Sequence, residues 1–97
     1  MVLEPGQADQ NPEVVDAPPP ELPAKAREAG VSGAFEAIFV VSAEGRPTQI
    51  QVRGEPAGYG FEEAIVKSIK RRRYKPAMQG GAPVPMKLSV PFDFAVE

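Results

Sequence analysis

The fold is decided by residues Val84–Val96, which read VPMKLSVPFDFAV. Every second residue from Val84 onward is apolar, and this period of two predicts a long strand with one buried face. Proline has no N–H to give to a neighbouring strand, so Pro85 and Pro91 indicate that the strand lies at the edge of a sheet. The sequence therefore predicts a long edge strand whose outer backbone groups are open to another chain.

A helix is predicted directly upstream of this strand. Glu62 and Glu63 stand in its first turn and the cations of Lys70–Arg73 in its last, as the helix dipole favours. Tyr74-Lys75-Pro76 ends it, since a residue before proline avoids the helical region. Apolar periodicity places the following residues on its buried face: Phe61, Ala64, Ile65, Ser68, Ile69 and Arg72.

A β-hairpin and a short helix are predicted further upstream. Val31–Ser42 is apolar on both faces, which is typical of a central strand, and it turns at residues 43–46 into a second strand, Thr48–Arg53. Pro23 and Gly30 bracket a helix of about two turns. The order α-β-β-α-β predicts an α+β fold, with a three-stranded antiparallel sheet and two helices packed on one face. We expect Phe39 and Phe94 to be buried beneath Phe61, Ile65 and Ile69.

The N-terminal end of the chain has a different composition. Residues 1–21 contain five acids and no Lys or Arg, so they carry −5, whereas residues 22–97 contain eleven basic and eight acidic residues and carry +3. A proline-rich segment of one charge sign and few large apolar groups is typical of disorder. We therefore predict two parts: residues 1–20 as the end of a disordered acidic linker that makes no stable contact, and residues 21–97 as the folded domain.

The composition also bears on chemistry. The chain has no Cys and no His, and no apolar run approaches the roughly 18 residues of a membrane span. The acid pair Glu62-Glu63 is explained by the helix dipole. We predict no catalytic, cofactor-binding or metal-binding residue, and no enzyme.

Basic residues are concentrated at the end of the second predicted helix. The run comprises Lys67, Lys70, Arg71, Arg72, Arg73 and Lys75. Such a run is typical of a solvated helix end, and it leaves open a patch for an acidic protein surface, an anionic lipid or a glycan. Nucleic acid is disfavoured, because no aromatic residues for base stacking alternate with these cations. We expect the stem of Arg72 to pack and its guanidinium to reach solvent or a carboxylate.

The order of these segments resembles the TonB C-terminal domain family. Five blocks carry the resemblance, at family-like spacing behind a proline-rich lead: Leu22-Pro23-Ala24-Lys25-Ala26; Gly33, Phe35, Ala37, Phe39, Val41 and Gly45; Phe61-Glu62-Glu63-Ala64-Ile65; Tyr74-Lys75-Pro76-Ala77; and Phe94-Ala95-Val96. The chain departs from the family pattern at Leu22, where Tyr is usual, at Glu44, where Asp is usual, and at Arg72, where Trp is common.

The resemblance implies a mechanical role without catalysis. Such domains lie in the periplasm, on a proline-rich spacer from an inner-membrane anchor that is absent from this chain, and couple to a proton-channel motor. They bind the TonB box, a short extended peptide of TonB-dependent outer-membrane transporters, by β-strand addition. A TolA-like or other cell-envelope scaffold domain is the alternative, and homodimer formation stays open. The expected partner-binding residues are Leu22, Pro23, Ala24, Lys25, Lys87, Leu88, Ser89, Val90, Pro91 and Phe92.

Overall fold

Three strands form the central sheet of the computed structural model, which describes residues 2–96. Their order is β3-β2-β7, with both neighbouring pairs antiparallel. β2 (Gly33–Val41) and β3 (Pro47–Glu55) make the predicted hairpin, and β7 (Met86–Phe94) closes the other edge. The predicted α+β class, the central position of β2 and the edge position of β7 are confirmed. Met1 and Glu97, the outermost residues of the two predicted segments, lie outside the described residues.

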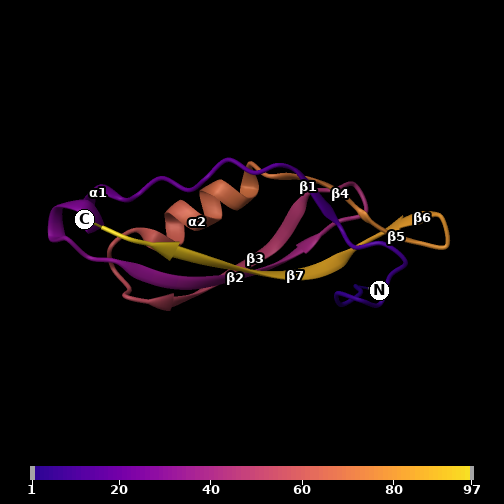
Figure 1. Ribbon diagram of the computed structural model, residues 1–97, viewed down its shortest axis with the longest axis horizontal. Helices are drawn as coiled ribbons and strands as arrows, with labels where there is room; N and C mark the ends of the chain where they lie inside the picture. Colours follow the sequence, from indigo (N-terminus) through magenta and orange to yellow (C-terminus); the bar gives the residue numbers. More distant parts are fainter. Residues whose placement is uncertain (1, 97) are drawn as a thin grey trace.

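α2 (Phe61–Lys70) lies over one face of this sheet, and α1 (Ala24–Ala29) lies beyond it at one end of the molecule (Figure 1). α1 begins after Pro23 and ends at Gly30, whose left-handed φ of 67° closes the helix as expected. α2 directs its apolar stripe at the sheet. The resulting core contains the following buried side chains: Ala26, Phe35, Ala37, Phe39, Val41, Phe61, Ile65, Ile69, Tyr74 and Phe92.

The two phenylalanines expected in the core differ in burial. Phe39 is fully buried, and its ring centroid lies 6.0 Å from that of Tyr74. Phe94 is half-buried and packs on Phe61 at 4.8 Å. Its partner across the ladder is Gly33, which has no side chain to cover it. The prediction is therefore confirmed for Phe39, whereas Phe94 lies at the rim of the core.

The second helix is shorter than predicted. α2 ends at Lys70, and Arg73–Lys75 forms a strand, β4, in place of the last helical turn. The Tyr74 N–H donates to the Gly45 carbonyl of the β2–β3 turn at 3.0 Å, and the Tyr74 side chain enters the core. These contacts hold the residues before Pro76 in an extended conformation, which proline at the next position also favours.

The thirteen-residue strand is also shorter than predicted. The structure divides Val84–Val96 at Pro85 into the end of β6 (Ala82–Val84) and the strand β7. β6 forms a hairpin with β5 (Ala77–Gln79) across a turn at Gly80-Gly81. Pro85 has no N–H for a ladder, so the apolar alternation continues across a point at which the hydrogen bonding changes partner.

The prediction that the N-terminal residues make no contact with the folded domain is wrong for the structure described. β1 (Glu13–Asp16) pairs with β4, and the Ser68 hydroxyl donates to the Pro18 carbonyl at 2.6 Å. In the β1–β4 register Glu13 faces Lys75 and Asp16 faces Arg73, so acids of one strand oppose cations of the other. Opposite charges placed across a ladder favour such a pairing.

Candidate partner-binding edge

β7 presents one side of its backbone to β2 and the other outward. The Lys87 N–H points outward, because it donates to the Leu3 carbonyl at 2.8 Å. Backbone groups alternate in direction along a strand, so Ser89 and Pro91 also face outward, whereas Leu88 and Val90 face β2. The only backbone partner described on the outward side is Leu3; no strand pairs with that side between Ser89 and Phe94 within residues 2–96.

Two prolines limit how much of this edge another strand can use. Carbonyls point outward at Pro85, Lys87 and Ser89, and N–H donors point outward at Lys87 and Ser89; Leu3 bonds the Pro85 carbonyl and the Lys87 N–H. Pro91 has no N–H, so a ladder that starts at Pro85 loses its next donor there. Between Pro85 and Pro91 the outer edge of β7 therefore offers a short row of three carbonyls and two N–H groups. We call this row the β7 window.

The six site residues predicted on β7 have two different roles in the structure. Lys87, Ser89 and Pro91 are exposed and supply the outward backbone. The alternate residues face the helices: Phe92 belongs to the core, and Leu88 and Val90 pack against it. These three side chains anchor the strand, so the backbone hydrogen bonds to a partner at this edge come from the odd-numbered residues.

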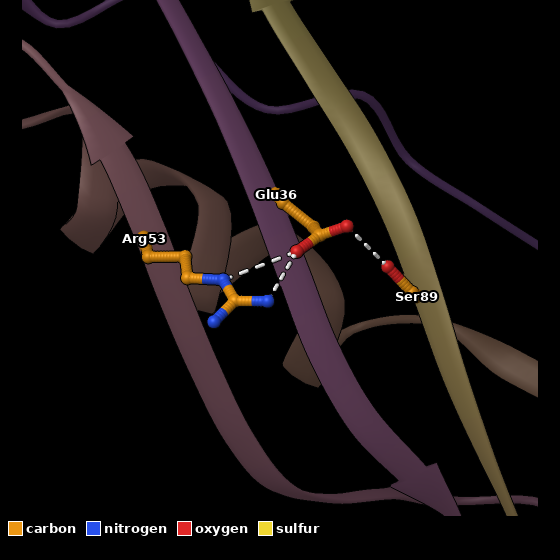
Figure 2. Close-up of polar contacts among 3 residues, drawn as sticks. All are labelled: Glu36, Arg53 and Ser89. Carbon is orange, nitrogen blue, oxygen red and sulfur yellow. Dashed lines mark hydrogen bonds and ion pairs between the residues drawn. The ribbon is translucent and has the colours of Figure 1, made fainter.

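A polar network ties the three strands together on the open face of the sheet. Arg53 on β3 donates through Nε and Nη2 to Glu36 Oε1, at 3.1 and 2.9 Å, and Ser89 Oγ on β7 donates to Glu36 Oε2 at 2.8 Å (Figure 2). The hydrogen bond from Ser89, and then the Arg53 contacts, hold the pKa of the Glu36 carboxyl below its ordinary value. The network fixes the Ser89 side chain against β2, while the Ser89 backbone stays directed outward.

A shallow pocket of about 200 Å³ lies beside the β7 window. Its lining combines the Glu36 network with residues from the N-terminal segment and β7: Glu4, Pro5, Glu36, Ile38, Arg53, Lys87, Leu88 and Ser89. A side chain projecting from an added strand would meet both an apolar surface and charged groups here.

The other four predicted site residues do not line this pocket. Leu22, Pro23 and Ala24 line a groove of about 350 Å³ between α1 and α2, together with residues 19–21. Lys25 is exposed on α1. The structure thus divides the predicted site between the helix layer and the sheet edge, and its role as a single binding site stays a prediction.

The basic run is exposed as expected at Lys67, Lys70, Arg71 and Arg73. Arg72 behaves differently, because it lies beyond the end of α2. Its guanidinium carbon lies 5.1 Å from the centre of the Phe92 ring, and Nη1 donates to the Tyr74 hydroxyl at 3.4 Å. Its Nε is buried without a hydrogen-bond partner among the described residues. The guanidinium therefore lies over an aromatic ring, and because Arg72 is only half-buried, the expectation that its head reaches solvent is not contradicted.

Sequence reasoning missed two residues at this edge, Leu3 and Glu36. Leu3 stood in a segment interpreted as disordered, and its only signal is an apolar side chain before Pro5. Glu36 stood on a strand with two apolar faces, where a lone carboxylate needs partners. Arg53 and Ser89 become identifiable as those partners only when the ladder register is known.

The fold and the partly open edge define the class of the protein: a small α+β domain with a proline-bounded sheet edge on which only Leu3 pairs within residues 2–96. Both helices described within residues 2–96 are too short and too polar to cross a membrane. That same stretch contains no group of three His, Cys, Asp or Glu residues placed to hold a metal ion.

Residues 18–96 match the family of the Gram-negative bacterial TonB protein C-terminal, and the chain belongs to this family. It is 36% identical to Pseudomonas aeruginosa protein TonB2 over 77 residues, which are 79% of this chain and 28% of the relative. It is 27% identical to P. aeruginosa protein TonB over 79 residues, or 81% of this chain and 23% of that relative. The chain thus spans about a quarter of the length of these curated relatives.

The fold itself is similar to a solved structure. The solution NMR structure of the P. aeruginosa TonB C-terminal domain matches with a TM-score of 0.77 and 23% identity, over 97% of this chain and 93% of the other. The predicted family and fold are confirmed, and the family match favours a TonB-type protein over a TolA-like scaffold. The family is one of Gram-negative bacteria.

Proposed function

We propose that this chain is the periplasmic C-terminal domain of a TonB-type energy transducer, and that it binds the TonB box of outer-membrane transporters at the β7 window. The bound peptide adds as a strand, and the domain passes mechanical work derived from the proton-motive force to the transporter. A membrane anchor and a contact with the inner-membrane proton-channel motor belong to parts of the protein outside this chain. The proposal assigns no catalysis, and homodimer formation stays a prediction.

One observation carries the proposal: the edge already accepts an extended backbone. The Leu3 N–H donates to the Pro85 carbonyl at 3.0 Å, and the Lys87 N–H donates to the Leu3 carbonyl. These two bonds form a parallel β-bridge in which Leu3 pairs with Met86. A partner peptide running in the same direction would form these bonds and continue to Ser89.

Strand addition also suits a partner that varies in sequence. The main-chain bonds of an added strand do not depend on side chains, whereas the adjoining pocket can select them. On the β7 window the outward donors and acceptors belong to Pro85, Lys87 and Ser89. The side chains that hold β7 in place are buried on the opposite face, so an occupied edge leaves the core unchanged.

The proposal is tested by removing one outward donor. Ser89→Pro deletes the Ser89 N–H. Pro91 shows that β7 tolerates proline at a position whose backbone faces outward. A backbone hydrogen bond contributes about 1 kcal/mol, and losing its donor leaves a peptide carbonyl unpaired, so we expect TonB-box peptides to bind about tenfold more weakly. Isothermal titration calorimetry with a panel of such peptides measures the change.

Ser89→Ala is the matched control, because it removes the hydroxyl and the bond to Glu36 but keeps the N–H. It should bind the peptides with nearly wild-type affinity. Near-UV and far-UV circular dichroism of both variants verifies that the fold is intact. Equal affinities for Ser89→Pro and the wild type would contradict binding at this edge.

A further inference from the structure

The N-terminal residues lie on the same edge that the proposed function assigns to a partner. Figure 1 shows the indigo N-terminal trace beside the start of β7. We call residues 2–10 the N-terminal strap. Leu3 pairs in parallel with Met86, through bonds of 3.0 Å to the Pro85 carbonyl and 2.8 Å from the Lys87 N–H. These bonds use the first outward acceptor and the first outward donor of the β7 window.

Further contacts hold the strap beside the domain. Gln10 and Met78 exchange reciprocal backbone bonds of 3.1 and 3.0 Å. Asp9 accepts from the Gly80 N–H at 2.8 Å, and its own N–H donates to the Gln79 side chain at 3.0 Å. β1 follows and pairs with β4. Leu3 is therefore tethered to the domain, and its local concentration at the edge is high.

The strap leaves the edge after the single pairing of Leu3 with Met86, and its sequence explains why. In a parallel ladder the residue two positions after Leu3 must donate to the Lys87 carbonyl, and that residue is Pro5, which has no N–H. Pro5 and Gly6 then form a turn, with Gly6 at φ 88° and the Gln7 N–H donating to the Glu4 carbonyl at 3.1 Å. The next outward groups, the Lys87 carbonyl and the Ser89 N–H, stay open.

We propose that the N-terminal strap is a built-in, displaceable occupant of the β7 window, which competes with the partner peptide for Pro85 and Lys87. This inference rests on the proposed function of the same edge. A peptide that extends to Ser89 makes five ladder bonds where Leu3 makes two, so it displaces the strap. Because the strap closes the edge in some molecules, the apparent affinity for the peptide equals the intrinsic affinity multiplied by the fraction of molecules in which the edge is open.

The competition is tested with variants of the complete chain. Leu3→Pro removes the N–H that donates to Pro85, whereas Val2→Pro places the same residue one position earlier, where the backbone faces away from β7. Pro5→Val combined with Gly6→Val removes the turn and supplies the missing donor to Lys87. The first variant should open the edge, the second should leave it unchanged, and the third should close it further.

Amide hydrogen exchange measured by NMR reports on the strap without any partner. We expect the Lys87 amide to exchange about fivefold or more faster in Leu3→Pro than in the wild type and Val2→Pro. In the double valine variant the Ser89 amide should gain protection. Equal exchange at Lys87 in the wild type and Leu3→Pro would overturn the strap contact.

Peptide titration reports on the competition. With TonB-box peptides, Leu3→Pro should bind about threefold to tenfold more tightly than the wild type, and the double valine variant correspondingly more weakly. Unchanged affinity in Leu3→Pro, despite faster exchange at Lys87, would overturn the competition. Absence of binding by every variant would overturn the proposed function instead, while the exchange at Lys87 still decides whether the strap occupies the edge.

Discussion

The two edges of the central sheet are built differently. β3 carries a β-bulge where the register shifts between Ile38 and Val40, and Gln49 there adopts a left-handed φ of 52°. β7 pairs with β2 in unbroken register over all nine residues. The irregularity of β3 lies within the strand, whereas the prolines at positions 85 and 91 leave a regular stretch between them.

The difference teaches how a small sheet can close one edge and keep the other available. A bulge twists an edge and interrupts its row of donors and acceptors, so the edge of β3 is a poor template for another strand. Two prolines a few residues apart limit the length of ladder that an edge strand can form, and they do so without distorting the strand. On β7 they permit a short ladder and prevent a long one, which suits recognition of a short peptide and opposes edge-to-edge aggregation.

The largest expected effect concerns Phe39, which lies on the central strand between the two edges. Phe39 is fully buried, opposite the bulge on one side and Leu88 on the other. Phe39→Ala should lower the free energy of unfolding by about 3–5 kcal/mol, because it leaves a cavity in the core. Chemical denaturation followed by circular dichroism measures this loss.

Phe94→Ala is the internal comparison for Phe39→Ala. Phe94 is half-buried at the end of β7, so its truncation should cost about half as much. A Phe94→Ala loss as large as that of Phe39→Ala would mean that the end of β7 is packed more tightly than the structure has it.

The second prediction addresses the bulge that closes the β3 edge. A β-branched residue adopts a left-handed φ poorly, so Gln49→Val should destabilise the domain by about 1–2 kcal/mol. Gln49→Gly should be neutral or up to about 1 kcal/mol stabilising, because glycine adopts this φ readily. Thermal unfolding of the pair measures the difference. Equal stability of the two variants would contradict the bulge.

The smallest expected effect is the pH dependence of the link between the edges. The pKa of Glu36 is lowered from 4.5 by hydrogen bonds from Ser89 and Arg53, so the folded state favours the ionised carboxylate. This contribution is fully present above pH 4.5 and is lost as the pH falls through the lowered pKa. Melting temperatures of the wild type and Glu36→Gln should therefore converge as the pH falls below 4.5. A difference that stays constant as the pH is lowered would show that the network does not titrate.

Much of the fold could be predicted from apolar periodicity. The alternation on Val84–Val96 indicated an edge strand, and the two apolar faces of Val31–Ser42 indicated a central one. Pro23 and Gly30 located α1 closely. These features depend on residues near one another in sequence, and such local patterns record which side of an element is buried.

The rest depends on contacts between distant residues. The four-residue strand β1 is an apolar Val14-Val15 pair between two acids, which is too short to signal a strand and becomes one only against the cations of β4. The division of the apolar alternation at Pro85 follows from a change of ladder partner, and the position of Arg72 from the early end of α2. At the candidate site, sequence reasoning identified the strand but not which of its residues face outward, because that depends on register.

The measurement that tests the central claim most directly is hydrogen exchange at the Ser89 amide, with and without a saturating TonB-box peptide. In the free chain this amide faces outward and has no backbone partner among the described residues. Strand addition at the β7 window gives it an acceptor, so its exchange should slow about tenfold or more while that of Val90, which faces β2, stays unchanged. Unchanged exchange at Ser89, with protection appearing instead on β3 or around Arg71 and Arg73, would contradict binding at this edge.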